Sequence, residues 1–171
     1  MLLSKVEKNI MKKMDFLTKL KKEESLKLVE PSDEISESYL IKSDKCLQVA
    51  KLAYGADIYE NSVSEAYYSI YNSVTSLFYK CGIKCENHSG AVILLKKLFN
   101  LDDLHVIFSE FKKDRIDNQY YVPISGTEPI DQKKCNERIK TAQRFSAELR
   151  AYIGRISIRE INNIRERFED V

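Results

Sequence analysis

Three short segments of the chain carry side chains that can bind or transform a phosphate ester. They are Tyr67-Tyr68, Lys84-Cys85-Glu86-Asn87-His88-Ser89 and Arg115-Ile116-Asp117-Asn118-Gln119-Tyr120-Tyr121. Basic and hydroxyl groups hold phosphate oxygens, and tyrosine rings offer flat surfaces on which nucleic-acid bases stack. The three segments therefore point to a nucleotide or an RNA strand as the molecule that they would contact.

The second segment lies directly before a helix that we expect over residues 89–99. A helix N-terminus exposes unpaired amides and the positive end of the helix dipole, which together attract anions. Lys84 adds a positive charge, Ser89 adds a hydroxyl, and His88 can exchange a proton near neutral pH. A structural interpretation is also open, in which Asn87 or Ser89 caps the helix and His88 holds the loop.

The third segment places an arginine near two tyrosines. Arg115 can hold a phosphate through two parallel N–H bonds, while Tyr120, on its flank of the same helix, can stack on a base. Asp117 and Tyr121 complete the predicted nucleotide contacts of this segment. The alternative is ordinary pairing of Arg115 and Asp117 with charged neighbours on an exposed helix face.

The tyrosine pair is expected on a helix that begins near Ser62. The segment Ser62-Val63-Ser64-Glu65 has the spacing of a capping box. Adjacent residues on a helix point about 100° apart, so we expect Tyr67 and Tyr71 to be half-buried and Tyr68 to face a groove or an interface. Alternatively, these rings are packing residues whose hydroxyls find a hydrogen-bond partner.

Helical periodicity dominates the chain and predicts an all-α fold. Proline occurs only at positions 31, 123 and 129, and the hairpin dipeptides Asn-Gly and Asp-Gly are absent. The expected helices cover about residues 3–28, 32–53, 62–81, 89–99, 102–121, 130–153 and 157–169, with an irregular loop at 122–129. An apolar stripe marks the first helix: Leu3, Val6, Ile10, Met14, Leu17 and Leu20.

These elements suggest three parts of the chain. Residues 1–30 form a basic amphipathic N-terminal helix, and residues 31–155 form the central helical domain. Residues 156–171 form a charged C-terminal helix that packs on that domain or extends it. The mildly basic ends are either a nucleic-acid patch or solvated helix faces.

The composition fits one globular domain in an aqueous compartment. Of the 171 residues, 43% are hydrophobic and 32% are charged, and the net charge is +2. No stretch approaches the roughly 18 uninterrupted apolar residues of a membrane span, and the N-terminal sequence turns charged too early for a secretory signal. We therefore expect a cytoplasmic protein without membrane contact, whose four cysteines are thiols.

Cys81 and Cys85 flank a glycine turn and raise the question of zinc binding. No second close Cys/His pair accompanies them, which such a site would need. We expect both to be small buried hydrophobic residues. Neither a metal nor another cofactor is predicted.

Taken in order, the motifs resemble the HEPN superfamily, in particular its small prokaryotic members. The matching residues are Gly55 after a long helix, Ala66-Tyr67-Tyr68 on the next helix, His88-Ser89 before a short helix, and the segment from Arg115 to Tyr121. The resemblance covers about residues 35–153. It implies an antiparallel up-and-down bundle of about five core helices that forms a homodimer, here with an extra N-terminal helix.

The resemblance also implies a link to RNA. Many HEPN proteins are metal-independent endoribonucleases, often toxins paired with a small nucleotidyltransferase antitoxin. Their catalytic signature is an arginine followed, after four to six residues, by a histidine. This chain departs from that signature, because Tyr120, Tyr121 and Val122 stand at the histidine positions after Arg115.

Metal-free RNA cleavage needs a base, an acid and positive charge near the phosphorus. Arg115 can supply the charge. Tyr120 is a poor base, because a tyrosine with a pKa of about 10 is ionised in only about one molecule in a thousand at pH 7, but it can act as an acid. His88 can substitute for the missing histidine if folding or dimerisation brings it to Arg115.

We therefore predict Arg115, His88 and Tyr120 as catalytic residues. The predicted contacts to a nucleotide or phosphate are Lys84, Ser89, Tyr68, Asp117 and Tyr121. Two functions remain open. The protein is either a metal-independent endoribonuclease paired with a nucleotidyltransferase, or a non-catalytic nucleotide-binding or adaptor dimer.

Overall fold

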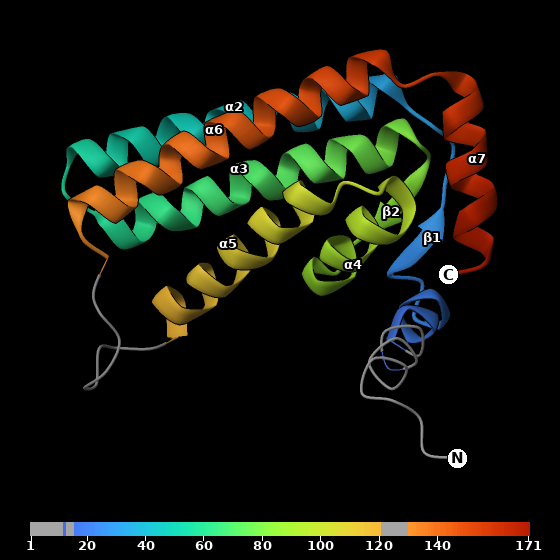
Figure 1. The fold of residues 1–171 in the computed structure, drawn as a ribbon, viewed down its shortest axis with the longest axis horizontal. Helices are drawn as coiled ribbons and strands as arrows, with labels where there is room; N and C mark the ends of the chain where they lie inside the picture. The colour runs from blue at the N-terminus through green and yellow to red at the C-terminus, as the bar shows by residue number, and fades with distance from the viewer. Residues whose placement is uncertain (1–11, 13–15, 121–129) are drawn as a thin grey trace.

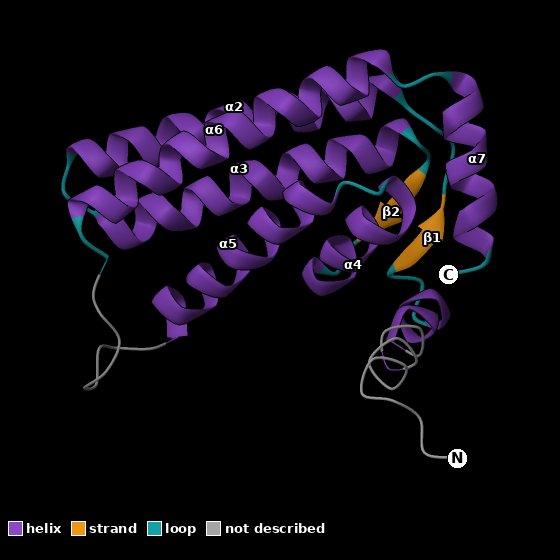
Figure 2. Cartoon of the chain, viewed as in Figure 1, coloured by secondary structure: helices purple, strands orange, loops and turns teal. Residues whose placement is uncertain are grey.

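The computed structural model describes residues 12, 16–120 and 130–171, except for the side chains of residues 117–120. Its elements are β1 (Leu26–Leu28), α2 (Asp33–Gly55), α3 (Tyr59–Lys80), β2 (Ile83–Cys85), α4 (His88–Phe99), α5 (Asp102–Tyr120), α6 (Gln132–Arg155) and α7 (Ile158–Glu169). The helices pack as a bundle (Figures 1 and 2). The prediction of an all-α bundle is confirmed, with two three-residue strands added to it.

Helix α3 lies at the centre of the bundle. It packs against α2, α5 and α6, and α2, α3, α5 and α6 alternate in direction (Figure 1). Its core residues include Val63, Ile70, Val74 and Leu77, each 0% exposed. Because neighbours cover α3 on several sides, successive residues of this helix contact different elements. The tyrosines near its middle can therefore meet side chains from α4 and α5.

A layer of serine hydroxyls fills the contact between α2, α3 and α6. The Ser43 hydroxyl lies 2.9 Å from that of Ser69 and 2.8 Å from that of Ser73. The Ser69 hydroxyl lies 3.2 Å from that of Ser146 on α6. All four side chains are buried. Small side chains let the helices approach closely, and each hydroxyl finds a partner, so no polar atom of this layer is left unsatisfied.

The strands β1 and β2 form an antiparallel pair in which Leu26 lies opposite Cys85 and Leu28 lies opposite Ile83. The predicted helix over residues 3–28 is therefore wrong at its C-terminal end. Residues 16–22 are helical, and Glu24 then adopts a φ of 55°, which ends the helix. The extended backbone that follows lets Leu26 bury its side chain to 1% exposure, and this burial overrides the helical periodicity.

The start of α3 also differs from the prediction. The helix begins at Tyr59, and no side chain caps its N-terminus. The Ser62 hydroxyl donates instead to the carbonyl of Ala50 on α2, at 2.7 Å. It therefore links two helices rather than capping one. A capping box does occur at the start of α7, between Ser157 and Glu160.

Helix α7 ties the strand pair to the bundle through Arg165. One guanidinium nitrogen of Arg165 donates to the carbonyls of Val29, Cys81 and Gly82 at 2.8, 3.2 and 3.0 Å. Gly82 has a φ of 67°, and a Cβ at this position would lie 2.0 Å from Nη1 of Arg165. Only glycine fits such a close approach.

Whether residues 1–30 and 156–171 form parts separate from the central domain stays a prediction.

Two predictions fall on residues that are not described. The first four positions of the N-terminal apolar stripe (Leu3, Val6, Ile10 and Met14) lie outside the described residues, as does the loop over residues 122–129. The remaining two positions of the stripe, Leu17 and Leu20, are buried at 0% and 4% exposure.

The four cysteines are thiols, and the prediction that Cys81 and Cys85 are buried is confirmed, at 0% and 6% exposure. Among the described side chains, no group of three or more His, Cys, Asp or Glu residues gathers as a metal site.

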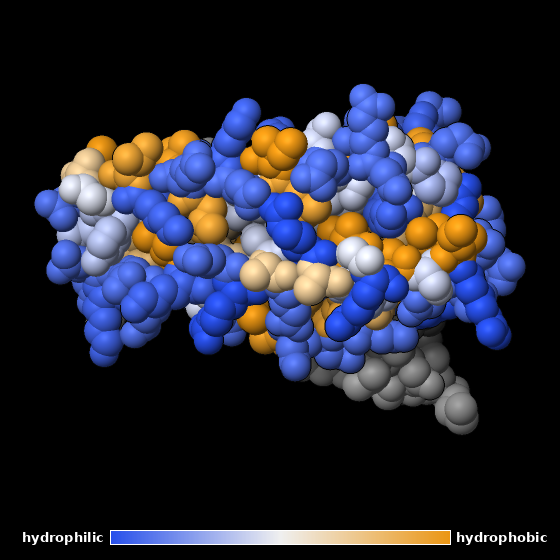
Figure 3. All heavy atoms as spheres, turned by 90° about the horizontal axis from the view of Figure 1, so that it is seen from above, coloured by the Kyte–Doolittle hydropathy of each residue, from blue (hydrophilic) through white to orange (hydrophobic). Residues whose placement is uncertain are grey.

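The outer surface mixes polar and apolar side chains. The face seen from above in Figure 3 shows hydrophobic residues interspersed with hydrophilic ones. The most exposed large hydrophobic residues of the described chain are Leu52 and Ile158, at 73% and 78%. Within the described ranges, no helix combines the length and the apolar character that crossing a membrane would require.

Candidate functional site

Asn87 forms the N-cap of α4 and thereby makes His88 the first residue of that helix. Its Oδ1 accepts hydrogen bonds from the backbone N–H groups of Ser89 and Gly90, each at 2.9 Å. The predicted capping role is confirmed for Asn87. Because these amides are already occupied, an anion at this end of α4 would be held mainly by side chains.

Tyrosines of α3 surround the ring of His88. Its Nδ1 hydrogen-bonds to the hydroxyl of Tyr67. Its face stacks on Tyr71, with ring centroids 4.0 Å apart and an interplanar angle of 21°. Tyr68 meets the imidazole edge-on at 6.5 Å. Positions 67, 68 and 71 span one turn of α3, which places all three rings against the start of α4.

The burial of these tyrosines differs in part from the sequence prediction. Tyr67, expected to be half-buried, is 0% exposed, whereas Tyr71 is partly buried as predicted. Tyr68 was expected to face a groove or an interface. It is partly buried and packs edge-on against Tyr67, with ring centroids 5.4 Å apart.

Helix α5 brings two basic side chains to the same place. The guanidinium carbon of Arg115 lies 5.6 Å from the ring centroid of Tyr67 and 5.4 Å from that of Tyr68, within cation–π range. One turn earlier on α5, Nζ of Lys112 donates to the hydroxyl of Ser89 at 2.6 Å. Together these side chains form the His88–Arg115 cluster, which consists of Tyr67, Tyr68, Tyr71, His88, Ser89, Lys112 and Arg115.

The cluster holds positive charge that no described carboxylate neutralises. Among the described side chains, neither Lys112 nor Arg115 forms an ion pair with an acid, and the buried Nε of Arg115 makes no hydrogen bond. The neighbouring acid, Asp114, pairs instead with Arg138 of α6 at 2.7 Å. Cations without a carboxylate partner form strong charge-assisted hydrogen bonds with anions, so an anionic ligand is a suitable partner for this cluster.

Burial and positive charge favour the neutral form of His88. Burial lowers the pKa of His88 below its usual 6.5, and the charges of Arg115 and Lys112 lower it further. Burial also lowers the pKa of Lys112, with a smaller effect from Arg115. Burial raises the pKa of Tyr67 and raises that of Tyr71 to about 12. At neutral pH the cluster therefore combines a neutral imidazole and protonated phenols with the guanidinium of Arg115.

The hydrogen bond between Tyr67 and His88 couples the tyrosine to the chemistry of the imidazole. When Nδ1 carries the proton and the Tyr67 oxygen accepts, Nε2 of His88 is unprotonated and can take a proton from a substrate. When the Tyr67 hydroxyl donates to Nδ1, Nε2 carries the proton and can donate to a phosphate oxygen. The same pair can therefore serve proton transfer and anion binding.

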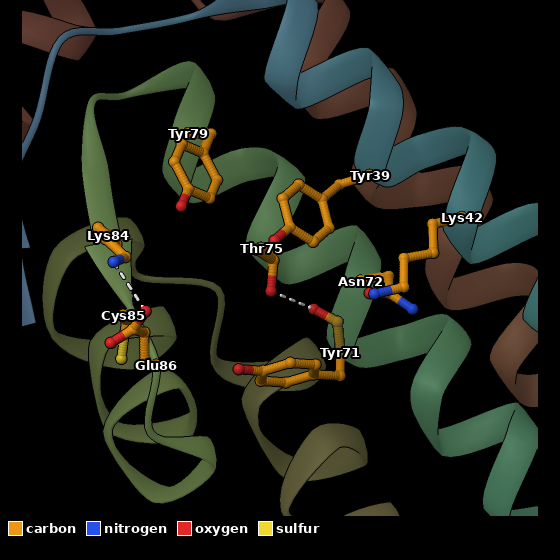
Figure 4. A pocket seen from close by; sticks show the side chains of 9 residues that line it. All are labelled: Tyr39, Lys42, Tyr71, Asn72, Thr75, Tyr79, Lys84, Cys85 and Glu86. Atoms are coloured by element: carbon orange, nitrogen blue, oxygen red, sulfur yellow. Dashed lines mark hydrogen bonds and ion pairs between the residues drawn. The ribbon is translucent and has the colours of Figure 1, made fainter. Parts of the chain in front are cut away.

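Lys84 lies beside a neighbouring pocket rather than in the cluster. It belongs to β2, and its Nζ lies 2.7 Å from Oε1 of Glu86. Both residues line a pocket of about 230 Å³ (Figure 4). Tyr71 lines this pocket as well, and its ring also stacks on His88. The ring of Tyr71 is thus common to the pocket and the cluster.

Three predicted site residues have no described side chain. Asp117 and Tyr120 lie on α5 within the range whose side chains are left undescribed, and Tyr121 lies outside the described residues. Their roles stay predictions.

The sequence interpretation missed Lys112 and Tyr71 as site residues. The spacing held a signal for both. Lys112 precedes Arg115 by three residues, and Tyr71 follows Tyr68 by three, so each shares a helix face with a residue that was identified.

The comparison with protein families identifies the domain that carries this cluster. The profile of the HEPN domain matches residues 36–152, about two thirds of the chain, and this range includes the whole His88–Arg115 cluster. A search among curated proteins finds no significant match. HEPN domains are linked to RNA binding and ribonuclease activity, and HEPN proteins often form dimers. The chain belongs to the HEPN domain family.

Proposed function

We propose that the protein binds RNA through the His88–Arg115 cluster and cleaves the strand without a metal ion. The observation that carries the proposal is the position of two different groups on one tyrosine. The Tyr67 hydroxyl hydrogen-bonds to His88, and the Tyr67 ring lies beneath the guanidinium of Arg115. A proton acceptor and a phosphate-binding charge are therefore close enough to act on one phosphodiester.

In the proposed reaction, His88 acts as the base. Its Nε2 takes the proton of a ribose 2′-hydroxyl, and the 2′-oxygen attacks the neighbouring phosphorus. The bond between phosphorus and the 5′-oxygen breaks, and that oxygen leaves with a proton from water or from Tyr120. The products are a 2′,3′-cyclic phosphate and a 5′-hydroxyl, and His88 then returns its proton to solvent.

The other members of the cluster stabilise charge and orientation. Arg115 binds the non-bridging phosphate oxygens, on which negative charge grows as the phosphorane forms. Lys112 adds a second cation, held by its hydrogen bond to Ser89. The Tyr67 oxygen accepts a hydrogen bond from the Nδ1–H group and so keeps Nε2 of His88 free for the substrate. Loss of one donor aimed at a developing oxyanion typically costs about 10²- to 10³-fold in kcat.

The test is incubation of the purified protein with end-labelled RNA in EDTA. We expect cleavage products that carry 2′,3′-cyclic phosphate. We expect His88→Ala and Arg115→Ala to lose at least about 100-fold of the cleavage rate. The matched control is His105→Ala, which removes the only other histidine of the chain and should leave the rate unchanged. Equal integrity of the RNA with wild type and with a His88→Ala/Arg115→Ala double variant would rule out the enzymatic proposal.

We also infer that the protein is a homodimeric toxin whose antitoxin is a small nucleotidyltransferase. Membership of a family that often forms dimers supports the first part of this inference. The order of motifs, shared with small prokaryotic HEPN proteins, supports the second. Light scattering on a sizing column should give twice the mass of one chain, and a nucleotidyltransferase encoded next to this gene should copurify with it. A monomeric mass, or separate elution of the two proteins, would contradict the respective part.

A second candidate function is non-catalytic, either nucleotide binding or an adaptor role. The observation that favours it is Tyr-Tyr-Val at positions 120–122, where ribonucleases of the family carry a histidine. Ligand binding can be measured by chemical unfolding, because a ligand at about 100 Kd adds about 2.7 kcal/mol to the free energy of unfolding. Stabilisation by RNA or nucleotides together with intact RNA would select this function. No stabilisation by either would leave the adaptor role.

A further inference from the structure

We propose that the pocket beside the cluster is a nucleobase subsite, which holds the base of a nucleotide whose phosphate lies at the His88–Arg115 cluster. This inference rests on the proposed function, because phosphate binding at the cluster is its starting point. The pocket is lined from α2, α3 and the β2 region (Figure 4). The lining residues that matter here are Tyr39, Lys42, Tyr71, Tyr79, Lys84 and Glu86.

Tyrosine rings give the pocket flat aromatic walls. Tyr39 and Tyr79 stack on each other with centroids 5.4 Å apart and an interplanar angle of 10°. In Figure 4 the ring of Tyr71 lies on the other side of the pocket from this pair. A planar heterocycle can stack on such rings, and one base–aromatic stack strengthens binding by about 5- to 150-fold.

The size of the pocket selects a single ring system. Its volume of about 230 Å³ is below the roughly 300–1,000 Å³ of sites that enclose a drug-sized ligand. A whole nucleotide would therefore extend out of the pocket. The part that extends is the sugar and phosphate, which carry the charge.

The pocket and the cluster are adjacent. Glu86 lines the pocket, and His88, two residues later, stacks on Tyr71 at 4.0 Å. The pocket and the imidazole therefore share the ring of Tyr71 and are joined by one short segment of backbone. In a nucleotide, the base and the phosphate are separated by one ribose. A base stacked in the pocket thus directs a phosphate of the same strand toward His88.

The charges favour this orientation over the reverse. Lys84 is neutralised by Glu86 at 2.7 Å, and the ammonium of Lys42 lies 5.7 Å from the ring centroid of Tyr39. Lys42 has no carboxylate partner among the described side chains, so the pocket holds one such cation, whereas the cluster holds two, Lys112 and Arg115. The phosphate therefore prefers the cluster, and the neutral base prefers the aromatic pocket. The Lys84–Glu86 pair offers a donor and an acceptor to the edge of the base.

The experiment compares two 2′-O-methyl RNA pentanucleotides that differ only in an abasic central position. The methyl groups prevent the proposed cleavage, and fluorescence anisotropy gives the affinities. Wild type should bind the complete strand about 5- to 150-fold more tightly than the abasic strand. Tyr39→Ala should reduce this ratio toward one, whereas Tyr39→Phe, which keeps the ring, should preserve it.

A second pair of variants avoids any effect of Tyr39 on folding. Lys42→Ala should weaken the complete strand more than the abasic strand, and Lys45→Ala, three residues along the exposed part of α2, should change neither. Arg115→Ala should weaken both strands equally. A parallel titration with nucleoside 5′-monophosphates and ribose 5-phosphate separates a free nucleotide from a strand as the source of the base. A preference for the base in either set that Tyr39→Ala or Lys42→Ala reduces supports the subsite.

The outcomes separate this inference from the proposed function. Equal binding of both strands to wild type, with both weakened by Arg115→Ala, would overturn the subsite and leave RNA binding at the cluster intact. A base preference that survives both Tyr39→Ala and Lys42→Ala would place base recognition elsewhere and also overturn the subsite. Failure to bind either strand or any nucleotide would overturn the proposed function and this inference together.

Discussion

Replacing Gly82 by alanine should destabilise the fold through backbone strain and through clashes of the added Cβ, of which the clash with Arg165 can be isolated. A non-glycine residue at the observed φ of 67° costs about 1–2 kcal/mol. The new Cβ would also lie 2.0 Å from Nη1 of Arg165, so this side chain must move away. Its hydrogen bonds to three carbonyls are then lost, at a net cost of about 1.5–3 kcal/mol for a charged donor. The expected loss is about 2.5–5 kcal/mol of unfolding free energy.

A double-mutant cycle isolates the part due to Arg165. Arg165→Ala alone should cost about 1.5–3 kcal/mol, because the same three carbonyls lose their donor. In that background, a Cβ at position 82 still meets the carbonyl oxygen of Val29 at 2.5 Å and Cδ of Pro31 at 2.9 Å. The Gly82→Ala substitution should then cost about 1–3 kcal/mol less than in wild type. Urea unfolding of the four proteins, followed by circular dichroism, measures the difference.

Gly154→Ala is the matched control for this cycle. Gly154 lies within α6, and apart from its chain neighbours and the backbone of its own helix turn, no atom comes within 4 Å of a Cβ added there. Alanine in a helix should raise the free energy of unfolding by about 0.5–1 kcal/mol. If the costs of Gly82→Ala and Arg165→Ala add to within about 0.5 kcal/mol, the contact between the two side chains does not decide the stability, and the reasoning is refuted.

Three further predictions concern the cluster and the serine layer. Tyr67→Phe removes the hydroxyl partner of Nδ1 of His88. The free energy of unfolding should fall by about 1–2 kcal/mol, and the ¹⁵N chemical shifts of the imidazole should change. Unchanged chemical shifts would show that the hydrogen bond does not set the tautomer of His88. The folded-state pKa of His88 is lowered below 6.5, so the unfolded chain binds the proton more readily than the folded chain. The contribution of neutral His88 to the free energy of unfolding should therefore be fully present above pH 6.5 and decline as the pH falls toward the folded-state pKa. His88→Gln should remove this part of the pH dependence of stability, and an identical pH dependence in both proteins would contradict the prediction. Ser43→Val leaves the hydroxyls of Ser69 and Ser73 without a shared partner and should cost about 1–3 kcal/mol in urea unfolding, whereas a cost below about 0.5 kcal/mol would mean that the layer contributes little.

The sequence predicted helices well where the periodicity agreed with a cap or a turn. Helix α4, expected over residues 89–99, covers His88–Phe99, and α5, expected over 102–121, covers Asp102–Tyr120. The side chain of Asn87 caps α4, as its residue type predicted. These boundaries depend on local interactions, which a sequence pattern records directly.

The errors came from contacts that are distant in sequence. Each strand has only three residues, too few to show a period of two, and the strands are separated by residues 29–82. Ser62 has the spacing of a capping residue, but its hydroxyl finds Ala50 on the adjacent helix at 2.7 Å. In both cases the pairing partner appears only after the chain has folded.

The candidate site shows the same division. Residue type was enough to select His88 and Arg115, but their meeting on Tyr67 depends on how α3, α4 and α5 pack. Lys84 was grouped with His88 because the two are close in sequence. The alternation of β2 instead buries Ile83 and Cys85 and leaves Lys84 beside the pocket.

The shared ring of Tyr71 gives the pocket and the imidazole a physical contact through which binding and protonation can be coupled. One face of this aromatic system is in contact with His88, and the same side chain borders the pocket. If a proton on His88 changes the affinity of a ligand in the pocket, that ligand must change the proton affinity of His88 by the same free energy. The pKa of His88, measured by pH titration, would then report the fraction of pockets that hold a ligand, without a label on the ligand.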